Sequence, residues 1–126
     1  MANKTVYAGK PGAPLSKAIK ANGFLFLTGH VAGPKDQVDA GDIGSQTSGT
    51  LENIKRTLTE CGASLEDVVR VTIYLTDMSD FAAMNDAYRA FFPQDPPARS
   101  TIGVKELGSP EYRIEVDVIA AVDEQA

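Results

Sequence analysis

Two side chains in this sequence, Arg99 and Glu115, have the types and spacing best suited to chemistry. Arg99 precedes a stretch that predicts a strand over residues 100–107, and Glu115 lies within an alternating stretch that predicts a strand over residues 112–122. Turn-forming residues at 108–111 separate the two, so we expect them to pair as a hairpin. Pairing would place an arginine fork that binds a carboxylate beside a glutamate that can transfer a proton. The combination outlines a small hydrolytic site for an anionic substrate.

The same two residues also fit a purely structural role. Arg99 would then be a solvated charge at the start of a strand, and Glu115 would lie on the wet face of a sheet. Along residues 112–122, the face opposite Glu115 carries the alternating side chains of Tyr112, Ile114, Val116, Val118 and Ala120. The spacing of the residues leaves both interpretations open.

The composition predicts one cytoplasmic domain spanning residues 1–126. Of the 126 residues 43% are hydrophobic, and the net charge of −5 comes without a cluster of basic residues, which argues against nucleic acid as the main partner. One histidine and one cysteine exclude a metal cluster and an internal disulfide framework. No apolar run approaches the roughly 18 residues that cross a bilayer, so we expect no membrane attachment.

The apolar pattern predicts two helices and several strands. Helical spacing of apolar side chains favours helices over residues 44–61 and 81–92. Short apolar runs predict strands over residues 15–20, 24–28 and 68–75, and the run at 24–28 predicts a strand buried on both faces. This order favours a mixed sheet with both helices on one face. The other face is then left uncovered, which implies a partner subunit.

Four motifs give the chain a resemblance to the RidA (YjgF) family of imine and enamine deaminases. They are Gln46-Thr47 followed by residues 51–53, Asp80-Phe81-Ala82 followed by Asn85 and residues 88–92, Pro97-Ala98-Arg99-Ser100, and Ile114-Glu115-Val116 followed by Ile119-Ala120. The resemblance covers nearly the whole chain, and the motifs stand in the family's order.

The resemblance implies an α+β, chorismate-mutase-like fold and a homotrimer whose sheets form a central barrel, with sites in the clefts between subunits. It implies a deaminase without a cofactor, which hydrolyses 2-aminoacrylate and related 2-imino acids to 2-keto acids and ammonia. In such an enzyme the residue matching Arg99 holds the substrate carboxylate, and the residue matching Glu115 positions or activates water.

The resemblance also indicates where the pocket of this chain departs from the usual one. Leu15 stands where many members have tyrosine, Lys17 where glutamine is usual, and Thr101 where several have cysteine. A Ser-Gly-Gln run is replaced by Thr28-Gly29-His30. We therefore expect the substrate to contact Arg99, Thr101, Asn85, Leu15, Gly29 and His30.

Three other functions stay open beside the 2-imino acid deaminase. One is a pathway-specific relative such as a 2-aminomuconate deaminase, in which Leu15 and His30 would reshape the pocket for a longer acid. Another is a regulatory member that binds 2-keto acids without useful turnover. The third is the ribonuclease or translation-inhibitor activity attributed to some relatives, against which the acidic charge weighs.

Overall fold

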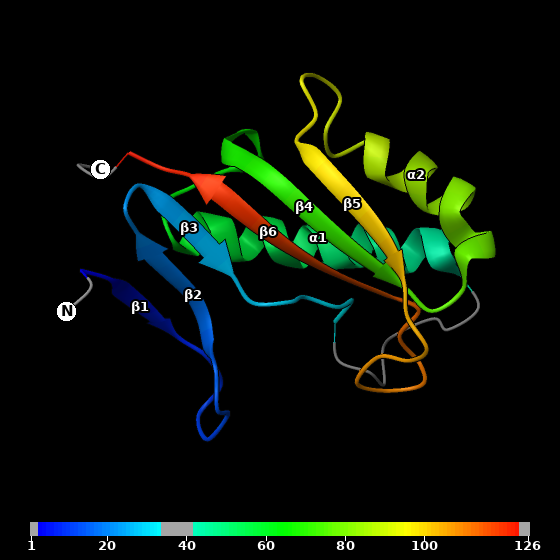
Figure 1. Cartoon of the computed structure of the whole chain (residues 1–126), viewed down its shortest axis with the longest axis horizontal. Helices are drawn as coiled ribbons and strands as arrows, with labels where there is room; N and C mark the ends of the chain where they lie inside the picture. The colour runs from blue at the N-terminus through cyan, green and yellow to red at the C-terminus, as the bar shows by residue number, and fades with distance from the viewer. Residues whose placement is uncertain (1–2, 34–41, 124–126) are drawn as a thin grey trace.

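The computed structural model describes residues 3–33 and 42–123, which form a six-stranded mixed sheet with two α-helices against one face (Figure 1). The strand order is β1-β2-β3-β6-β4-β5, and neighbouring strands are antiparallel except β4 and β5, which are parallel. The elements are β1 (Thr5–Ala8), β2 (Ser16–Ala21), β3 (Phe24–Leu27), α1 (Ile43–Glu60), β4 (Val68–Leu75), α2 (Phe81–Arg89), β5 (Ala98–Gly103) and β6 (Ile114–Ala121). The predicted α+β fold is confirmed.

The core lies between the helices and one face of the sheet. Helix α1 runs behind the strands in Figure 1 and packs against α2 and β6. The side chains that face this layer are fully buried, among them Leu51, Ile54, Leu58, Val71, Ile73, Leu75, Ile114, Val116 and Val118. Helical and alternating periodicity therefore predicted correctly which side of α1 and β6 is buried. In β4 the alternation holds for Val71, Ile73 and Leu75, but the pairing register shifts between Val68 and Arg70, which leaves Val69 42% exposed and buries Val68.

The predicted hairpin of residues 100–107 and 112–122 is wrong. Among residues 3–33 and 42–123, strand β5 pairs only with β4, and β4 pairs on its other side with β6, so β4 separates the two strands. The chain between β5 and β6 crosses the end of β4, where the N–H of Val104 donates to Leu75 and the N–H of Thr76 donates to Arg113. Sequence alternation identifies strands, but it does not show that an earlier strand is inserted between two later ones.

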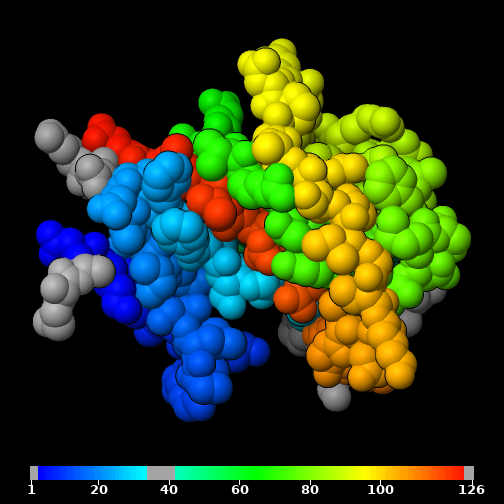
Figure 2. Space-filling view, viewed as in Figure 1, coloured from blue at the N-terminus to red at the C-terminus, as the bar shows by residue number. Residues whose placement is uncertain are grey.

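The second face of the sheet is not covered by the helices, and it carries exposed apolar side chains on its outer strands and polar ones such as Tyr74 and Asp117 on its central strands. Strand β3 was expected to be buried on both faces, but Phe24 and Phe26 are 42% and 43% exposed, while Leu25 and Leu27 point into the core. Alternation places the two phenylalanines on the face opposite the helices, with the exposed Val6 and Ile102 as further apolar residues of the outer strands. Figure 2 shows this face, with side chains of β3, β6, β4 and β5 at its surface. We call it the open face.

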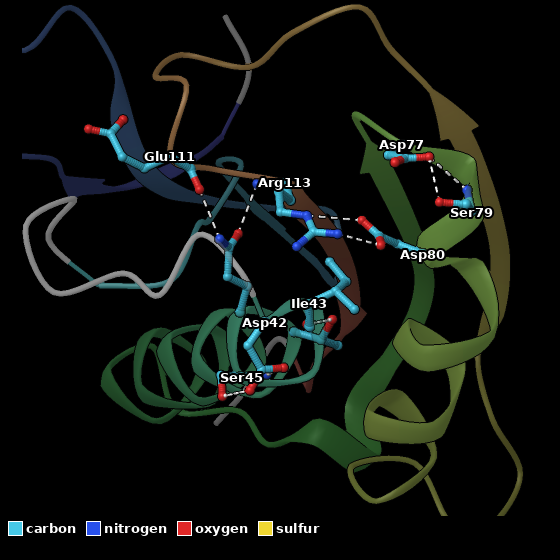
Figure 3. A network of polar contacts seen from close by, with 10 residues as sticks. Asp42, Ile43, Ser45, Asp77, Ser79, Asp80, Glu111 and Arg113 are labelled. Carbon is cyan, nitrogen blue, oxygen red and sulfur yellow. Dashed lines mark hydrogen bonds and ion pairs between the residues drawn. The ribbon is translucent and has the colours of Figure 1, made fainter.

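A polar network joins the start of β6 to both helices (Figure 3). The side-chain amide of Gln46 on α1 donates to the carbonyl of Glu111 at 2.8 Å and accepts from the N–H of Arg113 at 2.8 Å. The guanidinium of Arg113 binds both carboxylate oxygens of Asp80, which is only 7% exposed and directly precedes α2. The network therefore fixes the position of α2 relative to the sheet.

Replacing Asp80 tests how much this ion pair stabilises the fold. Asp80→Asn removes the charge that the largely buried Arg113 faces, so we expect the free energy of unfolding, measured by urea denaturation, to fall by about 2–3 kcal/mol. The control is Asp86→Asn, since the pair of Asp86 with Arg89 is 78% and 72% exposed and should contribute less than about 0.5 kcal/mol. Equal losses in the two variants would contradict a special role for the Asp80 pair.

Candidate active site

Arg99 lies on the helix-covered face, at the edge strand of the sheet. In the parallel pairing of β5 with β4 it stands beside the buried Val71, so both side chains point toward the helices. The guanidinium carbon of Arg99 lies 4.8 Å from the centre of the Tyr88 ring and 5.7 Å from the centre of the Phe81 ring, both on α2. These cation–π contacts hold the guanidinium at the junction of β5 and α2.

A hollow of about 300 Å³ opens beside this guanidinium. Its lining residues come from α2 and from the segment between α2 and β5, and they are Asn85, Tyr88, Arg89, Phe92, Pro96 and Pro97 together with Arg99 itself. Among the described residues, no carboxylate forms an ion pair with Arg99. An unpaired guanidinium in a small hollow is suited to bind a small organic carboxylate.

Three buried polar atoms at the same junction lack an ordinary hydrogen bond within residues 3–33 and 42–123. They are Oδ1 of Asn85, the hydroxyl of Tyr88 and Oγ1 of Thr101. Burial raises the pKa of Tyr88, while the charge of Arg99 and its guanidinium within bonding reach of the hydroxyl oppose the rise. Buried polar atoms are normally hydrogen-bonded, so such a group beside Arg99 indicates a place for a polar ligand.

Glu115 lies on the open face, near the start of β6. It stands opposite Tyr74 of β4 and against Gly29, where any side chain at residue 29 would overlap the Glu115 carboxylate. Burial, and then the charge of Asp117 on the same strand, raises the pKa of Glu115 above its ordinary value. Asp117 itself accepts a 3.0 Å hydrogen bond from the Tyr74 hydroxyl. A half-buried carboxylate that holds its proton more tightly than usual is suited to proton transfer.

The expected contact between Arg99 and Glu115 within one chain is absent, because the two residues lie on opposite faces of the sheet. Arg99 is in register with Val71 and Glu115 with Tyr74, and β4 stands between them. Two strand spacings and a three-residue offset put their Cα atoms roughly 14 Å apart. Arg99 and Glu115 therefore mark two separate places on one chain, which we call the candidate half-sites.

Two of the other expected site residues lie near Arg99: Asn85 lines the hollow, and Thr101 is two residues after Arg99 on the same face of β5. The remaining ones lie elsewhere. Leu15 is 54% exposed in the segment between β1 and β2, at the far edge of the sheet from β5. Lys17 forms a 2.8 Å ion pair with Glu60 of α1. The His30 ring binds the Thr28 carbonyl and the Thr57 hydroxyl, on the helix side of the sheet.

The aromatic residues that hold Arg99 were not among the expected site residues. Phe81 and Tyr88 were part of an apolar stripe typical of a helix core, and nothing in that stripe distinguishes packing from contact with a cation. The one available signal is the spacing of Phe81 and Tyr88, because residues seven apart lie on the same face of a helix and can contact one side chain of a neighbouring strand. Phe81, at 37% exposed, differs from a core residue only once the fold is known.

Within the described residues, no helix is long and apolar enough to cross a membrane. The same part of the chain contains no group of three or more histidine, cysteine, aspartate or glutamate side chains placed to hold a metal ion. Location in the cytoplasm stays a prediction, because one relative, a protein of Schizosaccharomyces pombe named as mitochondrial, is 41% identical over 109 residues. That match covers 85% of this chain and 67% of the fission yeast protein.

Other known proteins match nearly the full chain. The model of the family described as endoribonuclease L-PSP matches residues 6–122. A RutC family protein of Pyrococcus horikoshii is 46% identical over 118 residues, which is 92% of this chain and 93% of that protein. The crystal structure of a YjgF family protein from Neisseria meningitidis superposes with a TM-score of 0.84 at 32% identity and covers 97% of each chain. The chain therefore belongs to the RidA (YjgF) family, as its motifs predicted.

Proposed function

We propose that the protein is a cofactor-independent deaminase that hydrolyses 2-imino acids, including the imine form of 2-aminoacrylate, to 2-keto acids and ammonia. The observation that carries the proposal is Arg99, a guanidinium held by two aromatic rings beside a small hollow. In the part of the chain that the structure describes, no carboxylate is paired to it and unsatisfied polar atoms lie near it. A 2-imino acid offers the carboxylate for Arg99 and polar atoms for Asn85 and Thr101. Membership of the RidA family supports the same activity.

The reaction needs only water and one group that transfers protons. Glu115 takes a proton from water as the water oxygen adds to C2 of the imine, and returns it to the imine nitrogen, which gives a tetrahedral carbinolamine. The carboxylate then takes the hydroxyl proton and passes it to nitrogen, the C–N bond breaks, and ammonia leaves with the 2-keto acid. The raised pKa of Glu115 favours a carboxyl group that holds the proton between these steps.

The proposed site forms between chains. Since Arg99 and Glu115 occupy opposite faces of one sheet, a substrate that meets both needs Arg99 of one copy and Glu115 of another. The open face, with Phe24 and Phe26 exposed, provides a surface for such contact. We propose a homotrimer, as the family resemblance implies, with its sites at the subunit interfaces.

The alternative functions differ in what they require of Glu115 and of the hollow. A regulatory member that binds 2-keto acids needs Arg99 but no proton transfer, whereas a deaminase for longer acids such as 2-aminomuconate needs proton transfer and also a group that binds the second carboxylate. The matching family is described as an endoribonuclease, which would make RNA the substrate. The net charge of −5 does not favour binding of a phosphate backbone.

Arg99→Lys tests the carboxylate anchor. Lysine keeps the charge but loses the planar fork and its stacking on the Tyr88 and Phe81 rings, so we expect kcat/KM for freshly generated 2-iminobutanoate to fall by about 10²-fold. Ammonia release measures turnover, and calorimetry with 2-ketobutyrate measures binding. The exposed Arg56→Lys on α1 is the control. Turnover like that of the wild type in Arg99→Lys would refute the assignment.

Glu115→Gln tests proton transfer and separates an enzyme from a binding protein. Glutamine keeps the size but cannot take a proton, so kcat should fall by about 10²-fold while 2-keto acid binding through Arg99 persists. The exposed Glu52→Gln on α1 should leave kcat unchanged. If Glu115→Gln turns over every imino acid as fast as the wild type does, Glu115 is structural.

The pH dependence of kcat has a definite sign. Glu115 must be ionised to take a proton from water, so kcat falls as the pH drops through its pKa. Because burial raises that pKa, the fall begins at a higher pH than for a solvated glutamate. A profile of kcat against pH, with the stability of the protein checked at each point, should show this acidic limb in the wild type and lose it in Glu115→Gln.

Light scattering tests the assembly. At micromolar concentration we expect a mass of three times the 13.4 kDa of one chain. A monomer with full deaminase activity would contradict both the trimer and a site shared between copies.

A further inference from the structure

His30 connects three elements through both its main chain and its ring. Its N–H donates to the carbonyl of Val116 at 2.8 Å, and its carbonyl accepts from the N–H of Val116 at 3.0 Å. Its ring nitrogens lie 2.7 Å from the Thr28 carbonyl and 2.8 Å from Oγ1 of Thr57, a buried residue of α1. The residue therefore ties the chain after β3 to β6 on one side and to α1 on the other.

The partners of the ring determine its protonation. A carbonyl only accepts, so Nδ1 carries the hydrogen and donates it to Thr28, and Nε2 is free to accept from the Thr57 hydroxyl. Burial lowers the pKa of His30, which favours this neutral form, and the nearby charges of Lys17 and Glu60 act in opposite directions. A neutral ring held at both nitrogens does not offer a free group to a substrate.

The segment held by this ring lies directly against Glu115. Gly29 precedes His30, and any side chain at residue 29 would overlap the Glu115 carboxylate. Strand β3 ends at Leu27, so the Gly29 main chain is not held there by the β3 ladder. The nearest main-chain hydrogen bonds are those of Thr28 to Lys17 and of His30 to Val116, the neighbour of Glu115.

We propose that His30 is a positioning residue, whose ring locks the 28–30 segment to α1 and so holds the Gly29 main chain against the Glu115 carboxylate. The proposal rests on the proposed role of Glu115, and it assigns His30 to the support of that group instead of to direct contact with the substrate. The ring acts through geometry, by keeping water away from one side of the carboxylate.

This role has a signature that a general loss of stability does not produce. The groups facing Glu115 are Asp117 on its own strand, Tyr74 on β4 and the main chain of Gly29. Releasing Gly29 leaves Asp117 and Tyr74 in place but admits water to the Glu115 carboxylate. Water weakens the effect of burial, which is the larger of the two causes that raise the pKa of Glu115. Loss of the His30 lock should therefore lower the pKa of Glu115.

The test is carboxyl ¹³C NMR of the assembled protein, with the Glu115 signal assigned by its disappearance in Glu115→Gln. We expect the titration of Glu115 to move to lower pH in both His30→Ala and Thr57→Val. Thr47→Val is the matched control, because Thr47 is a buried α1 threonine whose hydroxyl bonds only its own helix at Ile43 in the described structure. Its titration curve should match that of the wild type.

Activity gives an independent second readout. In His30→Ala and Thr57→Val we expect kcat to fall about 10-fold with little change in KM, and the acidic limb of the kcat profile to shift to lower pH. His30→Asn, which can still donate to the Thr28 carbonyl, should retain part of kcat.

The outcomes separate this proposal from the proposed function. If Glu115 titrates in the folded His30→Ala and Thr57→Val proteins as it does in the wild type, the positioning role is wrong. If His30→Ala does not fold, the titration of Glu115 in Thr57→Val and in His30→Asn tests the positioning role in its place. A wild type without deaminase activity would overturn the proposed function, and the NMR titration would still decide whether His30 holds Gly29 against Glu115.

Discussion

The arrangement of the molecule depends on the double pairing of β4. This strand is hydrogen-bonded to β6 on one side and to β5 on the other, and its inward side chains Val71, Ile73 and Leu75 are completely buried. Because side chains alternate along a strand, the register with β4 also decides which face every residue of β5 and β6 occupies. A slip of one residue in β5 would turn Arg99 away from α2. The position of the candidate chemistry therefore follows from main-chain pairing.

The two half-sites contribute little to the stability of the chain. Glu115 makes no hydrogen bond among the described residues. Burial and the charge of Asp117 raise the pKa of its carboxyl group, so the ionised form destabilises the folded chain at neutral pH. Unsatisfied polar atoms near Arg99 also cost free energy. Stability comes instead from the apolar core and from contacts such as the Asp80–Arg113 pair. Groups kept at a cost to stability are typical of functional sites.

Sequence reasoning predicted the elements of this fold and the faces of the strands because periodicity is a local property. Helix α1 and the alternation of β6 needed only the pattern of apolar residues. Local patterns did not predict the partner of β5, which depends on a strand more than twenty positions earlier, nor the exposure of Phe24 and Phe26. The types of Arg99 and Glu115 suggested a site, but their separation depends on the sheet order. The contacts of His30 were likewise invisible, because they join segments 27 residues apart.

Half-sites on opposite faces of one sheet have a genetic consequence. In the proposed trimer, each site takes its guanidinium from one gene product and its carboxylate from another. Two inactive alleles, one defective at Arg99 and the other at Glu115, would then complement each other in mixed assemblies, since some interfaces would combine the two intact residues. Conversely, a poorly folded copy would disable a healthy neighbour. Selection would act on the interface between chains as strongly as on any single pocket.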